Sequence, residues 1–249
     1  MAIMEFFGCS FIAFGPPFAM FRHTVAHDPV RIIILIASSF FWLLSLLLSS
    51  MWWALLKPYD VPLAWSVGMS IVLQHILRFL VYRFWKRVEW GLKLVADRDS
   101  KTGVVDNKKY IIAYVSGLGF GIMSGAFAFI NILAESLGPG TVGIRGAGDS
   151  PMFFVTYALT TLCFILLHTS WNVIFHAGMN KRNYGLTFIV IVSHFAASSL
   201  TFFNKDKLYW ASILPNYFNL LVSGWLAFRC AGGRLYWMKS EHYHRLHQL

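Results

Sequence analysis

The stretch YIIAYVSGLGFGIMSGAFAFINILA, residues 110–134, runs for 25 residues without a charged side chain. An apolar run of about 20 residues is long enough to cross the hydrocarbon core of a bilayer as an α-helix. Gly117, Gly121 and Gly125 are spaced four residues apart, which places them on one face of that helix. A face without side chains allows another helix backbone to approach closely. The stretch therefore predicts a membrane helix that packs tightly against a neighbour.

The neighbour of this glycine face is left open by the pattern. It can be a helix of the same chain, or a helix of another subunit. Gly119 lies off the face, and we expect it only to add flexibility.

The whole chain has the composition of a membrane protein. Of its 249 residues 57% are hydrophobic and only 13% are charged, with a mean hydropathy of +0.58. A soluble globular domain has about a quarter of its residues charged. Seven apolar runs predict an all-α, polytopic bundle of seven transmembrane helices over residues 1–233, followed by a tail at 234–249. The predicted spans are 3–22, 32–56, 63–84, 111–134, 151–176, 185–203 and 211–230, with long loops only at 85–110 and 135–150.

The positive charge is concentrated on one side of the predicted spans. Sixteen of the 21 Lys and Arg residues lie in segments 22–31, 83–110, 177–184 and 229–249, and four lie in the alternate loops. The positive-inside rule then predicts a lumenal N-terminus and a cytosolic C-terminus, with lipid around the bundle. Because the basic residues flank apolar runs, we assign the net charge of +10 to membrane topology and exclude nucleic-acid binding.

Several polar residues interrupt the predicted spans, where burial of an ionisable group in lipid is costly. His168 and His194 lie inside spans five and six, and two interpretations are open. They can form a polar pair that locks helices or touches a partner, or each can bond separately to nearby backbone or hydroxyl groups. We expect Arg78 to extend its side chain to the membrane surface, Gln74 to bond another helix, and Asn131 to lie near the outer interface.

The sequence supports no catalytic site. Asp60 and Asp149 imitate the YD and GxGD motifs of intramembrane aspartyl proteases, but both fall in predicted outer loops rather than at membrane depth. Ser124 lies near Gly125, one residue out of step with a rhomboid-type GxSG element.

The sequence also contains no recognisable metal-binding or cofactor-binding motif. There is no HExxH, and Cys9, Cys163 and Cys230 lack metal-ligand spacing, so we predict no metal site and no cofactor. Histidines of the tail could bind a metal, but a solvated tail explains them. A lipid or small-molecule carrier stays an alternative, and it predicts a deep, polar cavity around His168 and His194.

Long segments of the chain resemble one family. The quoted segments are FFGCSFIAFGPPFAMF at 6–21, DPVRIIILI at 28–36, FFWLLSLLLSS at 40–50, AYVSGLGFGIMSG at 113–125, NILAESLGPGTVGI at 131–144, ILLHTSW at 165–171 and AGG at 231–233. They are similar to the anterior-pharynx-defective (Aph) family, the multi-pass scaffold subunit of γ-secretase. The short loop at 57–62 is more similar to invertebrate members than to vertebrate ones.

The resemblance implies a non-catalytic assembly subunit with seven spans in the orientation given above. Its implied partners are nicastrin, presenilin and the presenilin-enhancer subunit, with presenilin supplying the aspartates that cleave Notch and the amyloid precursor protein. Its implied locations are the endoplasmic reticulum, Golgi and plasma membrane. The family's glycine ladder matches Gly117, Gly121 and Gly125, and its membrane histidines, linked to assembly and active presenilin, match His168 and His194. The family's Gln-Glu pair in span three is Gln74-His75 here.

Overall fold

The computed structural model describes residues 2–59, 61–98, 109–137 and 152–233, and these residues form helices joined by short turns. The predicted all-α class is therefore confirmed. Within the described ranges the long helices are α1 (Ala2–Thr24), α2 (Pro29–Leu56), α3 (Leu63–Arg98), α4 (Lys109–Leu137), α5 (Phe153–Asn180), α6 (Tyr184–Leu200) and α7 (Tyr209–Cys230). Two 3-10 turns, η1 (Lys57–Tyr59) and η3 (Thr201–Asp206), follow α2 and α6.

Most helix ends lie within a few residues of the predicted spans, and α3 is the exception. The predicted span ends at residue 84, with a loop from 85, whereas α3 continues to Arg98. Charged residues mark where the helix leaves an apolar environment, not where the hydrogen-bonded backbone ends. The segment after residue 84 contains good helix formers, and Lys86 and Glu89 form an i, i+3 ion pair on it at 3.1 Å.

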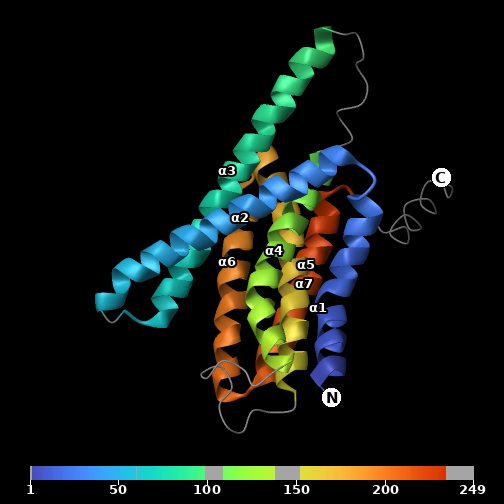
Figure 1. Ribbon diagram of the computed structural model, residues 1–249. Coiled ribbons are helices and arrows are strands. Elements are labelled where there is room, and N and C mark those ends of the chain that lie inside the picture. The colour runs from blue at the N-terminus through green and yellow to red at the C-terminus, as the bar shows by residue number, and fades with distance from the viewer. Residues whose placement is uncertain (1, 60, 99–108, 138–151, 234–249) are drawn as a thin grey trace, which may run out of the picture.

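The helices form an upright bundle crossed by a slanted helical hairpin. Helices α1, α4, α5, α6 and α7 run side by side, with α4 and α5 at the centre (Figure 1). The α2–α3 pair crosses the bundle obliquely, and its turn projects to one side (Figure 1). Asp28 begins α2 as the N-cap, because its carboxylate accepts the backbone N–H of Val30 at 3.0 Å.

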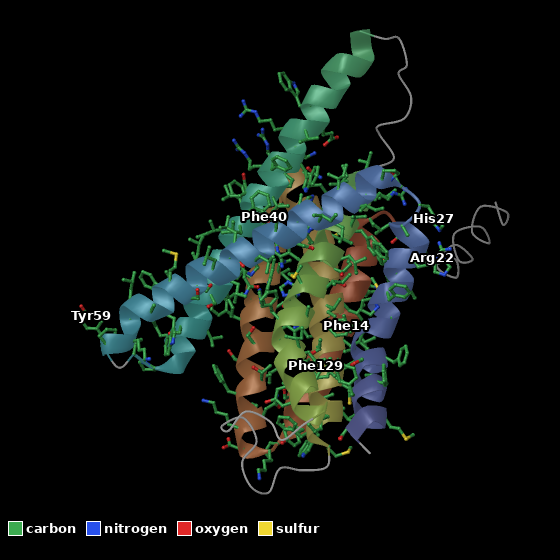
Figure 2. All side chains as sticks on the ribbon, viewed as in Figure 1. Phe14, Arg22, His27, Phe40, Tyr59 and Phe129 are labelled. Carbon is green, nitrogen blue, oxygen red and sulfur yellow. The ribbon has the colours of Figure 1, made fainter. Side chains whose placement is uncertain are left out.

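The core and the outer surface are both apolar, as expected where lipid is the solvent. Buried residues make up 56% of the apolar window of α5, but only 17% of that of α1. The rings of Phe14 and Phe129, 6.4 Å apart, pack α1 on α4, whereas Phe40 and Tyr59 are exposed at 61% and 76% (Figure 2). Large apolar side chains exposed on this scale mark contact with membrane or with partner proteins.

Six helices in the described part of the chain are long and apolar enough to cross a membrane: α1 to α6. The expected seventh span, α7, has 22 residues but carries more polar groups. Its Ser212, Asn216 and Ser223 are buried against the bundle, which lowers the hydropathy of α7 without placing these groups in lipid. The seventh crossing therefore stays a prediction, as does the orientation of the termini.

Some predicted features lie outside the described residues. These are Asp60, the segment 138–151 with Asp149, and the tail at 234–249 with its histidines. Asn131 lies within α4, but its side chain is not among those described.

Candidate helix-assembly site

The glycine face of α4 is occupied by α5 of the same chain. A Cβ atom added to Gly117 would lie 2.9 Å from the Cα and carbonyl oxygen of Thr169. A Cβ added to Gly121 would lie 2.5 Å from the carbonyl oxygen of Ile165. Since both obstacles are backbone atoms, neither position accommodates a side chain without separating the helices. The sequence allows this neighbour to be a helix of the same chain or of another subunit, and in the structure it is a helix of the same chain.

Gly125 makes a looser contact at the end of the same face. An added Cβ would lie 2.6 Å from Cδ1 of Ile165 and 3.0 Å from Cγ2 of Thr161, both on side chains. A side chain can rotate away where a backbone cannot, so this position is the most tolerant of the three.

Gly119 provides a second close contact, on another side of α4. An added Cβ would lie 2.5 Å from the carbonyl oxygen of Leu35 in α2. The expectation that Gly119 only adds flexibility is therefore wrong. Two hydrogen bonds reinforce this contact: Ser39 donates its hydroxyl to the Gly119 carbonyl at 3.0 Å, and Ser38 donates to the hydroxyl of Ser116 at 2.8 Å. Helix α4 is thus held between α2 and α5.

The two predicted histidines meet inside the bundle. The rings of His168 on α5 and His194 on α6 lie 5.2 Å apart in an edge-to-face arrangement, and both are buried. Neither bonds the other directly. Instead Nδ1 of His194 lies 3.2 Å from Nε2 of His75, and Nδ1 of His168 lies 2.9 Å from Nη2 of Arg78. His75 and Arg78 both come from α3, so the cluster joins three helices.

The bond to Arg78 fixes the state of His168. A guanidinium group can only donate hydrogen bonds, so Nδ1 of His168 accepts and carries no proton. Arg78 is completely buried, and its Cζ lies 5.6 Å from the ring centroid of Phe120. The expectation that Arg78 extends to the membrane surface is wrong, because α3 continues well past this residue and α5 covers it.

Arg78 and His75 are the site residues missed by the sequence prediction. Their i, i+3 spacing within one apolar run was the available signal, since it places both on one face of α3. Among the described residues no carboxylate pairs with Arg78, and its Nε and Nη1 atoms have no hydrogen-bond partner. The cluster therefore contains a cation whose single hydrogen-bond partner, the His168 imidazole, satisfies it only in part.

A cavity of about 320 Å³ adjoins the cluster. His168 and His194 form part of its wall, together with Ser124, Gly125 and Gln74. Oε1 of Gln74 has no hydrogen-bond partner in the described part of the chain, so the expected bond to another helix is not seen. This cavity is the one that a small-molecule carrier would require. No hydrogen bond between described residues joins Ser124 to either histidine, so the arrangement of nucleophile and base is incomplete.

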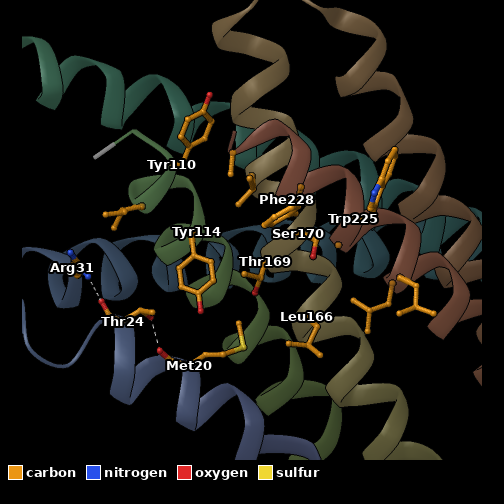
Figure 3. Close-up of a pocket in the computed structure, with 17 residues that line it drawn as sticks. Met20, Thr24, Arg31, Tyr110, Tyr114, Leu166, Thr169, Ser170, Trp225 and Phe228 are labelled. Carbon is orange, nitrogen blue, oxygen red and sulfur yellow. Dashed lines mark hydrogen bonds between the residues drawn. The ribbon is translucent and has the colours of Figure 1, made fainter. Parts of the chain in front are cut away.

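A larger groove opens on the opposite side of α5. Its volume is about 740 Å³, and it lies between α1, α4, α5 and α7. Tyr110 and Tyr114 project from α4 along one side, and Trp225 and Phe228 project from α7 along the other (Figure 3). Gly224 of α7 borders the groove, and a Cβ added there would meet nothing within 4 Å.

At one end of the groove, Arg31 donates from Nη1 to the carbonyl of Thr24 at 2.6 Å (Figure 3). Its Nε lies 3.2 Å from the carboxylate of Asp28. The cation at the end of the groove is therefore already paired within the chain.

Comparison with known proteins identifies a single family. The family model described as Aph-1 protein matches residues 4–234. The chain is 52% identical over 233 residues to gamma-secretase subunit Aph-1 of Drosophila melanogaster, covering 94% of this chain and 95% of the relative. It is 43% identical to gamma-secretase subunit Aph-1b of Danio rerio and 42% identical to gamma-secretase subunit APH-1B of Homo sapiens, covering 94% of this chain and 92% and 91% of those relatives.

The backbone contact between α4 and α5 predicts opposite effects for two glycine substitutions. Gly121→Ala should destabilise the isolated chain by about 1–3 kcal/mol, because its Cβ forces α5 away. Gly224→Ala should leave the stability unchanged or raise it by up to about 1 kcal/mol, because alanine favours a helix and nothing obstructs the methyl group. Thermal unfolding in detergent measures both, and an unchanged midpoint for Gly121→Ala would disprove the close contact.

The bond between Arg78 and His168 predicts that the effects of substituting these two residues on stability are not additive. His168→Ala alone should cost about 3–5 kcal/mol, because it leaves a buried cation without its partner. After Arg78→Met the same substitution should cost about 1–3 kcal/mol less. The control is Phe154→Ala on the same helix, which is buried in a separate apolar cluster several turns away and should cost equal amounts in both backgrounds. A double-mutant cycle of detergent unfolding provides the test, and additive effects at His168 would exclude the bond.

Proposed function

The chain belongs to the Aph-1 family, and we propose that it is a non-catalytic scaffold subunit of a γ-secretase complex. In this role it assembles presenilin with nicastrin and the presenilin-enhancer subunit, and so supports the cleavage of Notch and amyloid-precursor-type substrates by presenilin. The names of its relatives, gamma-secretase subunits, support membership of the complex. The internal packing described above supports the scaffold role, since it uses the polar and small residues to build a bundle.

The observation that carries the proposal is the apolar groove beside α5. The glycine face of α4 is filled by α5, so it offers no surface to a partner. The groove between α1, α4, α5 and α7 is apolar, open along the bundle, and bordered by Gly224 and Ala227. Small residues at such a border allow a helix to approach closely without moving side chains. We assign this groove to one transmembrane helix of another subunit.

The proposed absence of catalysis agrees with the state of the buried histidines. Nδ1 of His168 accepts from Arg78, so the proton of this ring is on Nε2, and the ring cannot take a proton from Ser124. Nδ1 of His194 lies next to His75, and no hydrogen bond between described residues joins His194 to Ser124. A role in assembly explains why the cluster spans α3, α5 and α6. The proposed locations are the endoplasmic reticulum, Golgi and plasma membrane, as the family resemblance implies.

Binding of a small molecule is a second candidate function, favoured by the cavity beside the histidine cluster. Its volume of about 320 Å³ lies at the small end of the range for ligand sites, which suits a small polar molecule better than a two-chain lipid. This function is compatible with the scaffold role, because the cavity and the groove lie on different sides of α5.

The groove predicts that a bulky residue at Gly224 blocks assembly without unfolding the chain. Gly224→Leu should reduce co-purification of the other subunits at least tenfold, since the leucine enters the groove. Gly8→Leu is the matched control, because Gly8 is also a helical glycine with open space around it but does not border the groove. Equal recovery of the complex with both variants would refute this assignment of the groove.

The charge distribution predicts the orientation of the chain, which contains no Asn-x-Ser/Thr sequon of its own. A short tag carrying one sequon should be glycosylated when fused to the N-terminus and not when fused to the C-terminus. A gel shift on deglycosylation gives the result. The reverse pattern would overturn the proposed orientation, and glycosylation of both tags would overturn the odd number of spans.

A further inference from the structure

Helix α3 extends beyond the end of the bundle (Figure 1). Its 36 residues correspond to a length of about 54 Å, whereas the hydrocarbon core of a bilayer is about 30 Å thick. Apart from the buried Arg78, the charged side chains of this helix begin at Arg83, about 20 residues after its start at Leu63, which is the length that crosses the core. The turns that start at Arg83 therefore lie where the helix reaches the lipid headgroups.

These turns present a basic and aromatic stripe. Arg83, Arg87 and Trp90 have the i, i+4, i+7 spacing of one helix face, and all three are exposed, Trp90 at 64%. The other side of the helix is occupied, because Tyr82 and Trp85 are buried. Lys86 is neutralised by its ion pair with Glu89, but no acidic side chain in the described part of the chain pairs with Arg83 or Arg87.

The turn between α5 and α6 adds two more exposed cations at the same end of the bundle. Tyr82 donates its hydroxyl to Oδ1 of Asn180 at 3.0 Å, which holds α3 against the end of α5. Lys181 and Arg182 follow directly and are exposed. Arg182 has a φ of 53°, a left-handed conformation that ends α5 sharply and places both residues at the tip of the turn.

The end of the bundle around these residues is also positively charged. Among the side chains described there, only two are carboxylates, Asp28 and Glu89, and both are already in ion pairs. The Lys and Arg side chains described at this end number eight: Arg22, Arg31, Arg83, Lys86, Arg87, Lys181, Arg182 and Arg229. A surface with this excess attracts anions at the depth of the headgroups.

We propose that Arg83, Arg87, Trp90, Lys181 and Arg182, here called the α3 basic surface, bind the phosphate groups of anionic phospholipids in the leaflet that faces them. Guanidinium groups form paired hydrogen bonds with phosphate oxygens. The exposed indole of Trp90 favours the boundary between headgroups and acyl chains, which fits a lipid ligand better than a soluble acidic protein. This binding goes beyond the scaffold role and needs no partner subunit.

The test uses the purified full chain in nanodiscs and a fluorescent phosphatidylinositol 4,5-bisphosphate as probe. Removing two charges with Arg83→Gln and Arg87→Gln should weaken probe binding about thirtyfold, because each basic residue near a membrane surface contributes about a factor of five to binding. The matched control removes two charges at the opposite end with Lys57→Gln and Lys205→Gln, and should leave probe binding unchanged. The thermal unfolding midpoint of each variant verifies that it is folded.

The lipid composition of the nanodiscs distinguishes binding to any anionic headgroup from binding to clustered phosphates. Nanodiscs with phosphatidylserine, at the same total headgroup charge, should compete with the probe if the surface responds to charge alone. Weak competition would show a preference for clustered phosphates, and either result supports the proposal. Binding that the Arg83 and Arg87 substitutions leave unchanged, or that the control pair weakens equally, would overturn it. Because the isolated chain is used, failure here leaves the co-purification test of the scaffold role unaffected.

Discussion

The contact between the backbones of α4 and α5 determines the rest of the arrangement. With no side chain at Gly117 or Gly121, α5 comes close enough for the backbone of Thr169 and Ile165 to touch α4. A rotation of α4 would bring Leu118 or Phe120 into that position, and neither would fit. The contact thereby fixes both the rotation and the height of α4. It also directs Gly119 toward α2, so that one helix holds two neighbours through two sets of close contacts.

Polar bonds attach the slanted α2–α3 hairpin to this central pair. Helix α3 crosses the bundle obliquely, so it cannot pack along the full length of α5 (Figure 1). Val81 and Trp85 of α3 pack into the apolar core, and three directed contacts add to them: Arg78 with His168, His75 with His194, and Tyr82 with Asn180. In lipid, where apolar packing gives little preference between helices and the bilayer, such directed bonds specify where a helix lies.

The sequence is sufficient to locate the helices, but it does not show which helices contact each other. Hydropathy located each apolar run because lipid demands a long uncharged segment, and the glycine spacing identified the correct face of α4. Periodicity gives a face but not its partner, so it could not select α5 over another subunit. Charge does not locate the end of α3, because the hydrogen-bonded backbone continues past the membrane, and the same misplaced end gives the wrong expectation for Arg78. Spacing places His75 and Arg78 on one face of α3, but it does not show that His194 and His168 face them.

The position of Arg78 has a consequence for how the protein is made. A membrane protein is synthesised from its N-terminus, and the partner of Arg78 lies 90 residues later in the chain. When α3 enters the membrane, neither His168 nor His194 has yet been translated, so the guanidinium has no protein acceptor at its final depth. An unpaired arginine in lipid is costly. The buried position that Arg78 has in the folded bundle is therefore complete only once α5 is in place.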